Sequence, residues 1–336
     1  MKAFQVVGSF GLENLKLVDV PDPKPGPGQV VVKTRAASLN YRDLVVIKGG
    51  YGPRQTVPRI PISDAAGEIA AVGEGVTRVR PGDRVVCCFC PTWMDGDVAQ
   101  EHMDAALGCY VDGVLCEYLL ISADAVLPIP AHLSFEEAAT LPCAALTAWN
   151  ALFVTDHIGP GQTIVAQGTG GVSLFALQFA RMAGARVVIT SSSDQKLARA
   201  RELGAHGTIN YKTTPDWDKE ARKLTGGRGA DQVVEVGGAG TLNRSLNCVR
   251  MGGTVTMIGV LAGASAEIRT TLILFRSVRV QGVFVGSRAM FEDMNRAITA
   301  HGLRPVVDRA FPFAEAPAAL RHLESGSHFG KVAITF

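Results

Sequence analysis

The feature that most constrains the fold is a glycine-rich turn near the middle of the chain. Residues 163–167 form a short apolar run, and residues 168–173 follow it with the sequence Gly-Thr-Gly-Gly-Val-Ser. Apolar residues then recur on one helical face up to residue 184, and residues 186–190 are apolar again. Strand, tight turn, helix and strand in this order predict a right-handed βαβ unit of a parallel sheet.

The turn is a candidate binding site for a pyrophosphate. Gly168 permits a tight backbone, and Gly170 has no Cβ to keep an anion from the main chain. The start of the helix adds unpaired N–H groups and a partial positive charge. Ser173 stands where a third glycine is usual, so the prediction depends on the strand and helix around the turn. The residues expected to line the site are Gly168, Thr169, Gly170, Gly171 and Val172.

The end of the second strand indicates which nucleotide fits. An acidic residue there would bind the ribose 2′-hydroxyl of NAD, but this chain has Ser191 followed by Ser192. Hydroxyl groups and an ammonium group suit a 2′-phosphate, and Lys196 and Tyr211 are placed to complete such a pocket. We therefore predict NADPH rather than NADH, and we interpret Asp194 as a first-turn helix acid.

Composition excludes several classes of function. The chain has 336 residues, of which 47% are hydrophobic, and its 33 basic residues nearly balance 31 acidic ones. This balance gives no case for a nucleic-acid or membrane partner. No apolar run approaches the length of a membrane span, and the first residues lack a signal-peptide core. Seven cysteines without regular spacing are typical of free thiols, so we expect a cytoplasmic protein.

The pattern differs between the ends of the chain and its middle. Residues 1–37, 65–76 and 83–90 read as antiparallel strands, and residues 91–113 as a long loop. A capping box at 134–137 opens a helix that Pro142 should interrupt. From 163 to 285, six strands alternate with helices, which predicts a doubly wound parallel sheet. The strand-like segments 304–313 and 331–336 are expected to pack back on the N-terminal strands.

With these motifs in view, the chain resembles the medium-chain dehydrogenase/reductase superfamily, and within it the zinc-free quinone oxidoreductase-like branch. The resemblance implies an α/β protein with a GroES-like β-rich catalytic domain (residues 1–125 and 286–336) and a Rossmann domain (residues 126–285). It also implies an active cleft between the domains and a homodimer formed through the last Rossmann strand, at 278–285. The motifs that carry it are 38–43 (Ser-Leu-Asn-Tyr-Arg-Asp), 82–85 (Gly-Asp-Arg-Val), 146–148 (Leu-Thr-Ala), 170–172 (Gly-Gly-Val), 209–211 (Ile-Asn-Tyr) and 330–332 (Gly-Lys-Val).

The resemblance also raises the question of a metal. Zinc members of the superfamily carry a catalytic cysteine near position 40 and Gly-His-Glu after the next proline. This chain has Asn40 and, after Pro61, Ile-Ser-Asp at 62–64. The cysteines at 87, 88, 90, 109 and 116 do not fit the four-cysteine structural lobe. We therefore predict no metal site.

A metal-free site favours hydride transfer from NADPH to a quinone or an α,β-unsaturated carbonyl compound, because hydrogen bonds can stabilise the charge that develops on oxygen. Asn40 and Tyr41 are the candidates for donating those bonds, and by resemblance Tyr51 reaches the same pocket. A structural role for each residue stays open, and the final proton is expected from solvent. By resemblance, the residues expected around the nicotinamide half are Thr147, Gly259, Val260, Val285, Gly286, Ser287 and Lys331.

Three other readings remain open. One is a metal-free alcohol dehydrogenase, and another is a protein that binds NADPH without physiologically relevant turnover. The third uses acyl-CoA-linked enoyl substrates, whose phosphates would meet Arg42, Arg54 or Arg59, although solvated surface is the expected place of these arginines.

Overall fold

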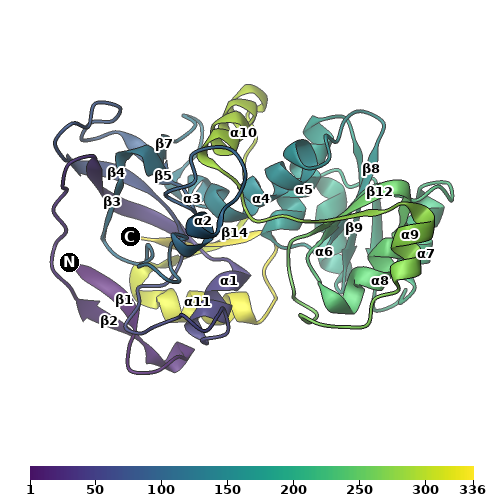
Figure 1. Cartoon of the computed structure of the whole chain (residues 1–336), viewed down its shortest axis with the longest axis horizontal. Coiled ribbons are helices and arrows are strands. Elements are labelled where there is room, and N and C mark those ends of the chain that lie inside the picture. Colours follow the sequence, from purple (N-terminus) through teal and green to yellow (C-terminus); the bar gives the residue numbers. More distant parts are fainter. The chain divides into compact units, whose positions relative to one another are not determined.

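The computed structural model describes residues 1–336 and divides into two compact units (Figure 1). Unit 1 comprises Met1–Leu146 and Val285–Phe336, and unit 2 comprises Thr147–Phe284. The first segment of unit 1 extends beyond the expected residue 125 because helix α3 (Phe135–Ala138) packs against strands β3 and β4 of that unit. The chain therefore leaves unit 1, forms unit 2 and returns.

Unit 1 is built on a seven-stranded sheet. Its path is β14-β15-β3-β4-β5-β7, with β6 paired to β3, and a separate two-stranded sheet joins β1 and β2. The last strand lies antiparallel to β3, so the C-terminal segments pack on the N-terminal strands as predicted (Figure 1). The strands are β1 (Lys2–Val6), β2 (Leu15–Asp19), β3 (Gln29–Ser38), β4 (Asp64–Val72), β5 (Arg84–Cys87), β6 (Tyr118–Ser122), β7 (Val126–Pro128), β14 (Val307–Pro312) and β15 (Lys331–Thr335).

The helices of unit 1 differ from the expectation at one place, where the segment 91–113 contains a short helix, α2 (Gln100–Asp104). The helix opened by the capping box, α3, ends at Ala138, and a new helical segment that contains Pro142 begins at Leu141, so the helix is interrupted here as expected. Pro142 lies in the first turn of a π-helix, Leu141–Ala145, where its missing N–H leaves no hydrogen bond broken. The capping box is confirmed, since Glu137 N donates to Ser134 Oγ at 3.2 Å. The other helices are α1 (Tyr41–Ile47), α2 (Gln100–Asp104), α10 (Arg288–His301), α11 (Ala316–Glu324) and the 3₁₀ turns Leu12–Asn14, Ala123–Ala125 and Phe313–Glu315.

Unit 2 is the predicted doubly wound parallel sheet. Its strand order is β10-β9-β8-β11-β12-β13, and every neighbouring pair is parallel. The strands are β8 (Thr163–Gln167), β9 (Arg186–Ser191), β10 (Gly207–Asn210), β11 (Ala230–Glu235), β12 (Val249–Met257) and β13 (Arg279–Gly282). The helical segments are α4 (Leu146–Trp149), a π-helix at Asn150–Val154, α5 (Gly171–Met182), α6 (Asp194–Glu202), α7 (Trp217–Leu224), α8 (Ala239–Cys248) and α9 (Thr270–Arg276).

An apolar core holds the sheet of unit 2 to its helices. Val165, Val188 and Val233 on the central strands pack with Trp217 of α7 and Leu246 of α8, and all five are buried. Removing this apolar surface from water stabilises the unit by about 25 cal/mol per Å². None of the helices in the molecule is long and apolar enough to cross a membrane.

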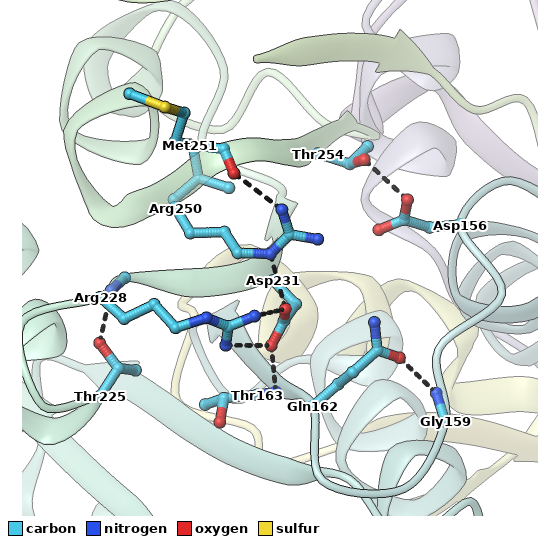
Figure 2. A network of polar contacts seen from close by, with 12 residues as sticks. Asp156, Gly159, Gln162, Thr163, Thr225, Arg228, Asp231, Arg250, Met251 and Thr254 are labelled. Carbon is cyan, nitrogen blue, oxygen red and sulfur yellow. Dashed lines mark hydrogen bonds and ion pairs between the residues drawn. The ribbon is translucent and has the colours of Figure 1, made fainter. Parts of the chain in front are cut away.

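A network of hydrogen bonds and ion pairs lies at the amino end of the same sheet (Figure 2). The buried carboxylate of Asp231, at the start of β11, accepts bonds from Thr163 N at 2.8 Å and from Arg250 Nε at 2.7 Å. Arg228 Nη2 donates to it at 2.6 Å. This network joins β8, β11 and β12 at their beginnings and leaves their carboxyl ends for the glycine turn.

Candidate active site

The glycine turn lies where the strand order of unit 2 reverses. Strand β8 lies between β9 and β11. The chain that leaves β8 continues to β9 on one side, and the chain that leaves β11 continues to β12 on the other side. Such a switch point leaves a crevice at the carboxyl ends of the strands. Gly168 has φ 75°, and Gly170 is the N-cap of α5 without any side-chain cap. A Cβ added at Gly168 or at Gly170 would meet nothing within 4 Å, so the space beside the turn is open.

A cavity of about 430 Å³ adjoins this turn. Its size suits a small-molecule site. Gly168 and Tyr211, both predicted for the cofactor, line it together with Thr190, Trp217 and Arg244, and the other lining residues also belong to unit 2. The cavity and the turn form one continuous candidate site at the carboxyl ends of the parallel strands.

Two residues that the sequence analysis missed hold the switch point together. Gln167 ends β8 and Glu235 ends β11, and both are buried. Gln167 Nε2 donates to Glu235 Oε2 at 2.7 Å, while Glu235 Oε1 accepts bonds from Gly237 N and Gly238 N at 2.8 and 2.9 Å. Hydrogen bonds thus compensate the buried acid. An acidic residue that ends an apolar strand was the available signal for this contact.

The remaining residues predicted to bind the nucleotide lie in the glycine turn, at the start of α5 and at the end of β9. Thr169 is buried in the turn, and Gly171 and Val172 are the first residues of α5. Ser191 is 4% exposed, and its Oγ accepts a bond from Ser193 N at 3.3 Å.

The neighbours of Ser191 belong to helix α6 and its approach. Ser192 is half-buried, and Lys196 lies in the first turn of α6. Asp194 accepts a bond from Asn210 Nδ2 at 2.8 Å, which agrees with the structural role expected of this acid.

Several residues expected near the nicotinamide have a structural role in their own unit. A Cβ at Gly259 would lie 2.5 Å from Val236 O, so glycine is needed for the close approach of two chains. Val260 follows it and is exposed. Thr147, the first residue of unit 2, is buried in α4. Their contact with a cofactor stays a prediction.

Three further residues expected near the nicotinamide, Val285, Gly286 and Ser287, belong to unit 1 and follow β13. Val285 has φ 40°, a backbone conformation that β-branched residues rarely adopt. A Cβ at Gly286 would lie 2.8 Å from Leu146 Cγ, and Ser287 caps α10 by accepting a bond from Met290 N at 3.3 Å.

Unit 1 contains a buried polar cluster, formed by Asn40, Asp43, Asp64 and Lys331. Lys331, predicted as a cofactor ligand, begins β15 and is 3% exposed. Its Nζ donates to Leu39 O and to Asn40 Oδ1. The structure therefore places this ammonium group on the residue that was predicted to contact substrate.

The two carboxylates of the polar cluster accept hydrogen bonds from the backbone. Asp43 Oδ2 accepts from Asn40 N at 2.7 Å, and Asp64 Oδ2 accepts from Cys143 N at 3.2 Å. Burial raises the pKa of Asp43 to about 7, although its bond to Asn40 and the charge of Arg42 oppose this. Burial also raises the pKa of Asp64, against the charge of Lys331.

Backbone strain adjoins the polar cluster. Ile62, two residues before Asp64, is buried and has φ 72°. Val114 N donates to Ile62 O at 2.9 Å, and a Cβ at Gly108 would lie 2.7 Å from the same oxygen. Such strain in a β-branched residue persists only where the surrounding structure imposes it, and it concentrates at functional sites.

Lys331 orients the amide of Asn40. A lysine can only donate, so Asn40 Oδ1 faces it and Asn40 Nδ2 faces away. This Nδ2 is buried and makes no hydrogen bond of ordinary geometry. A side-chain hydrogen bond from Asn40 nevertheless helps to lower the pKa of Asp64. Tyr41 begins α1 and is 49% exposed. Burial raises the pKa of Tyr51, so its phenol remains a donor at neutral pH.

The donor set does not fit a zinc site. No group of three or more His, Cys, Asp or Glu side chains is arranged to hold a metal ion. At the position where a thiolate would be required, Asn40 binds an ammonium group. All seven cysteines are free, and burial raises the pKa of thiols such as Cys90 and Cys116 to about 12.

Comparison with known proteins agrees with this architecture. Residues 26–131 match the alcohol dehydrogenase GroES-like domain, and residues 171–300 match the zinc-binding dehydrogenase family. A zinc-type alcohol dehydrogenase-like protein of Schizosaccharomyces pombe is 46% identical over 96% of both chains. Acryloyl-coenzyme A reductase of Metallosphaera sedula is 30% identical over 100% of both chains. Quinone oxidoreductase of Rattus norvegicus is 28% identical over 99% of this chain and 97% of its own.

Solved structures give the same result. An NAD-dependent alcohol dehydrogenase superposes with a TM-score of 0.92 at 34% identity, with 100% of both chains covered. A mycobacterial protein complexed with NADPH superposes with a TM-score of 0.85 at 27% identity, again over 100% of both chains. The chain therefore belongs to the medium-chain dehydrogenase/reductase superfamily of oxidoreductases.

Proposed function

We propose that this protein reduces a quinone or an α,β-unsaturated carbonyl compound with NADPH and without a catalytic metal. The observation that carries the proposal is the open glycine turn beside the cavity at the switch point of β8. In unit 1, a donor set that does not fit a metal ion and the amide of Asn40, which Lys331 orients, support the choice of substrate.

The residues present fit a dinucleotide. The turn at 168–172 and the start of α5 would hold the pyrophosphate, and the cavity would hold the adenosine part. Ser191 and Ser192, with Lys196 and Tyr211, would bind the 2′-phosphate, since β9 ends without a carboxylate. When bound, the reduced nicotinamide supplies a hydride to an electrophilic carbon of the substrate.

The chain's own contribution lies at the substrate oxygen. As the substrate accepts a hydride, negative charge develops on its carbonyl oxygen. The donors proposed for it are Asn40 Nδ2, whose amide Lys331 orients, and the phenols of Tyr41, which follows Asn40 in the chain, and Tyr51, which lies beside Arg42. A preorganised donor in a buried site stabilises such charge by roughly 3–4 kcal/mol. Solvent supplies the final proton.

The test is a substrate panel followed by NADPH absorbance. We expect turnover of enones or quinones, and a loss of roughly 100-fold in kcat/KM when Asn40→Ala is combined with Tyr41→Phe. Leu17→Ala, at an exposed apolar position of β2, serves as the control. If the double variant retains full kcat/KM on every enone that the parent accepts, the assignment of the oxygen donors is wrong.

Alcohol oxidation is the second candidate, because several relatives carry the name alcohol dehydrogenase. The same assay run with NADP⁺ and small alcohols separates the two. Alcohol oxidation faster than enone reduction would favour this candidate. Tight NADPH binding without turnover of any substrate would instead indicate a protein that only binds the cofactor.

A further inference from the structure

A serine, a histidine and an aspartate of unit 1 lie together near the end of the chain. Asp308 belongs to β14, His322 to the last turn of α11, and Ser327 to the loop between α11 and β15. Asp308 Oδ2 is 2.9 Å from His322 Nε2, and Ser327 Oγ is 3.4 Å from the other ring nitrogen, Nδ1. The second contact is loose, as is common in sites that hold no substrate. One imidazole ring therefore joins the carboxylate to the hydroxyl group.

The aspartate decides which nitrogen of the ring carries the proton. An ionised carboxylate can only accept, so it keeps a proton on Nε2, and Nδ1 of the neutral ring is then an acceptor. This tautomer can take a proton from Ser327. The carboxylate is itself held, because Asp308 Oδ1 accepts a bond from Phe329 N at 3.1 Å. The ring of His322 lies beside that of Phe311, with 5.6 Å between the ring centres.

The hydroxyl group is more accessible than the two groups behind it. Ser327 is exposed, whereas the side chains of His322 and Asp308 are 24% and 18% exposed. A second hydroxyl, Ser325 Oγ, lies 2.7 Å from Ser327 Oγ and donates to the backbone oxygen of His322 at 2.7 Å. Ser325 thus bonds to the backbone of this histidine, and Ser327 is the hydroxyl that lies beside its ring.

The backbone around Ser327 defines the class of substrate. Ordinary esters and amides react at a serine only where N–H groups stabilise the oxygen that becomes charged. Gly326 N already donates to Leu323 O at 3.1 Å, and Ser327 N donates to Ser325 Oγ at 3.3 Å. An acyl donor must therefore have a good leaving group, which makes it an activated ester.

We propose that Ser327 is an acyl-acceptor site for activated esters, with His322 as its general base and Asp308 as the residue that orients the base. Ser327 Oγ forms a bond to the acyl carbon, and the bond from that carbon to the leaving oxygen breaks with its electron pair. The proton of Ser327 passes to His322 Nδ1 and then to solvent. The step uses no nicotinamide cofactor, so it does not rest on the proposed function.

The experiment treats the whole protein with p-nitrophenyl acetate and locates acetyl groups by peptide mass spectrometry. We expect an acetyl group on Ser327, and a fall of roughly 100-fold in its rate of formation in His322→Gln, as the loss of a general base implies. Asp308→Asn should cause a similar fall, because an asparagine amide donates to Nε2 and leaves the ring proton on Nδ1. Acetylation of Lys24, an exposed lysine, is the internal reference in the same digest.

Two matched variants control for exposure and composition. Ser9→Ala and His301→Gln each remove an exposed residue of the same type from unit 1, and both should leave the acetylation of Ser327 unchanged.

The aspartate variant keeps the inference testable if His322→Gln does not fold. Asparagine at position 308 retains an oxygen for the bond from Phe329 N. Acetyl groups found only on lysines or on Ser325 would overturn the proposal. Equal rates at Ser327 in the parent and in Asp308→Asn would also overturn it.

Discussion

At the residue scale, Asp43 shows how burial changes the chemistry of one side chain. It is 1% exposed, and its carboxylate holds the backbone of Asn40 while its pKa rises to about 7. The residue motif that contains it was visible in the sequence. Its raised pKa was not, because desolvation depends on the strands and helices that pack around α1.

This shift predicts a pH dependence of stability. Asp43 binds its proton more tightly in the folded protein than in the unfolded chain, so folding is favoured while the group is protonated. The contribution is therefore full below pH 4 and is lost as the pH rises toward 7, by about 2 kcal/mol between pH 5 and pH 7. Urea denaturation at the two pH values should show this loss in the parent and not in Asp43→Asn. Asp97→Asn, an exposed site, should behave as the parent, and equal pH slopes in all three proteins would contradict the prediction.

The orientation of Asn40 belongs to the same scale. The sequence identified Asn40 as the residue in place of a zinc-ligating cysteine, and it assigned Lys331 to the cofactor. Only the folded chain brings these two residues, nearly 300 positions apart, into hydrogen-bond contact. A lysine at the start of the last strand carries no local signal for the amide that it will orient.

At the element scale, the segments with a clear hydrophobic pattern were predicted well. Strand β8 has the expected bounds, because an apolar run between turn residues is a local feature. Helix α9 and the π-helix after Thr140 were not predicted. Their helical form depends on what they pack against, and Pro142 is tolerated because it lies in the first turn, where no backbone hydrogen bond is lost.

The end of β9 carries a prediction about the cofactor. Ser191→Asp places a carboxylate where a 2′-phosphate is expected, and a carboxylate repels that phosphate while it accepts a bond from a ribose hydroxyl. We expect the NADPH-to-NADH ratio of kcat/KM to fall by roughly 10- to 100-fold. NADPH fluorescence on binding gives a second readout, independent of turnover. Ser191→Ala is the control for the loss of the hydroxyl, and an unchanged ratio in Ser191→Asp would refute the NADPH assignment.

At the scale of the whole molecule, one edge of the large parallel sheet is left uncovered. Strand β13 ends the sheet, and all four of its residues are exposed. Leu274 and Phe275 of the preceding helix are 72% and 74% exposed. A free sheet edge beside large apolar side chains is suited to pair with another chain. We propose that a second copy of this protein pairs there, in a homodimer.

The dimer proposal predicts a change in mass. Replacing Leu274 and Phe275 by aspartate should shift the protein from dimer to monomer in sedimentation velocity, because charge at the centre of an apolar contact opposes association. Leu17→Asp, at another exposed leucine, should leave the mass unchanged. A parent protein that sediments as a monomer over the whole concentration range would overturn the proposal.

The sequence by itself determined the class of fold and the place of the glycine turn, since both follow from local periods and from residues with special backbone freedom. It also indicated the return of the C-terminal strands to the N-terminal sheet. The tertiary structure alone decided which polar groups meet in the buried interior, such as Gln167 with Glu235 and Asn40 with Lys331. The reason is physical, because a side chain's hydrogen bonds and charge state depend on groups that only long-range packing brings within reach.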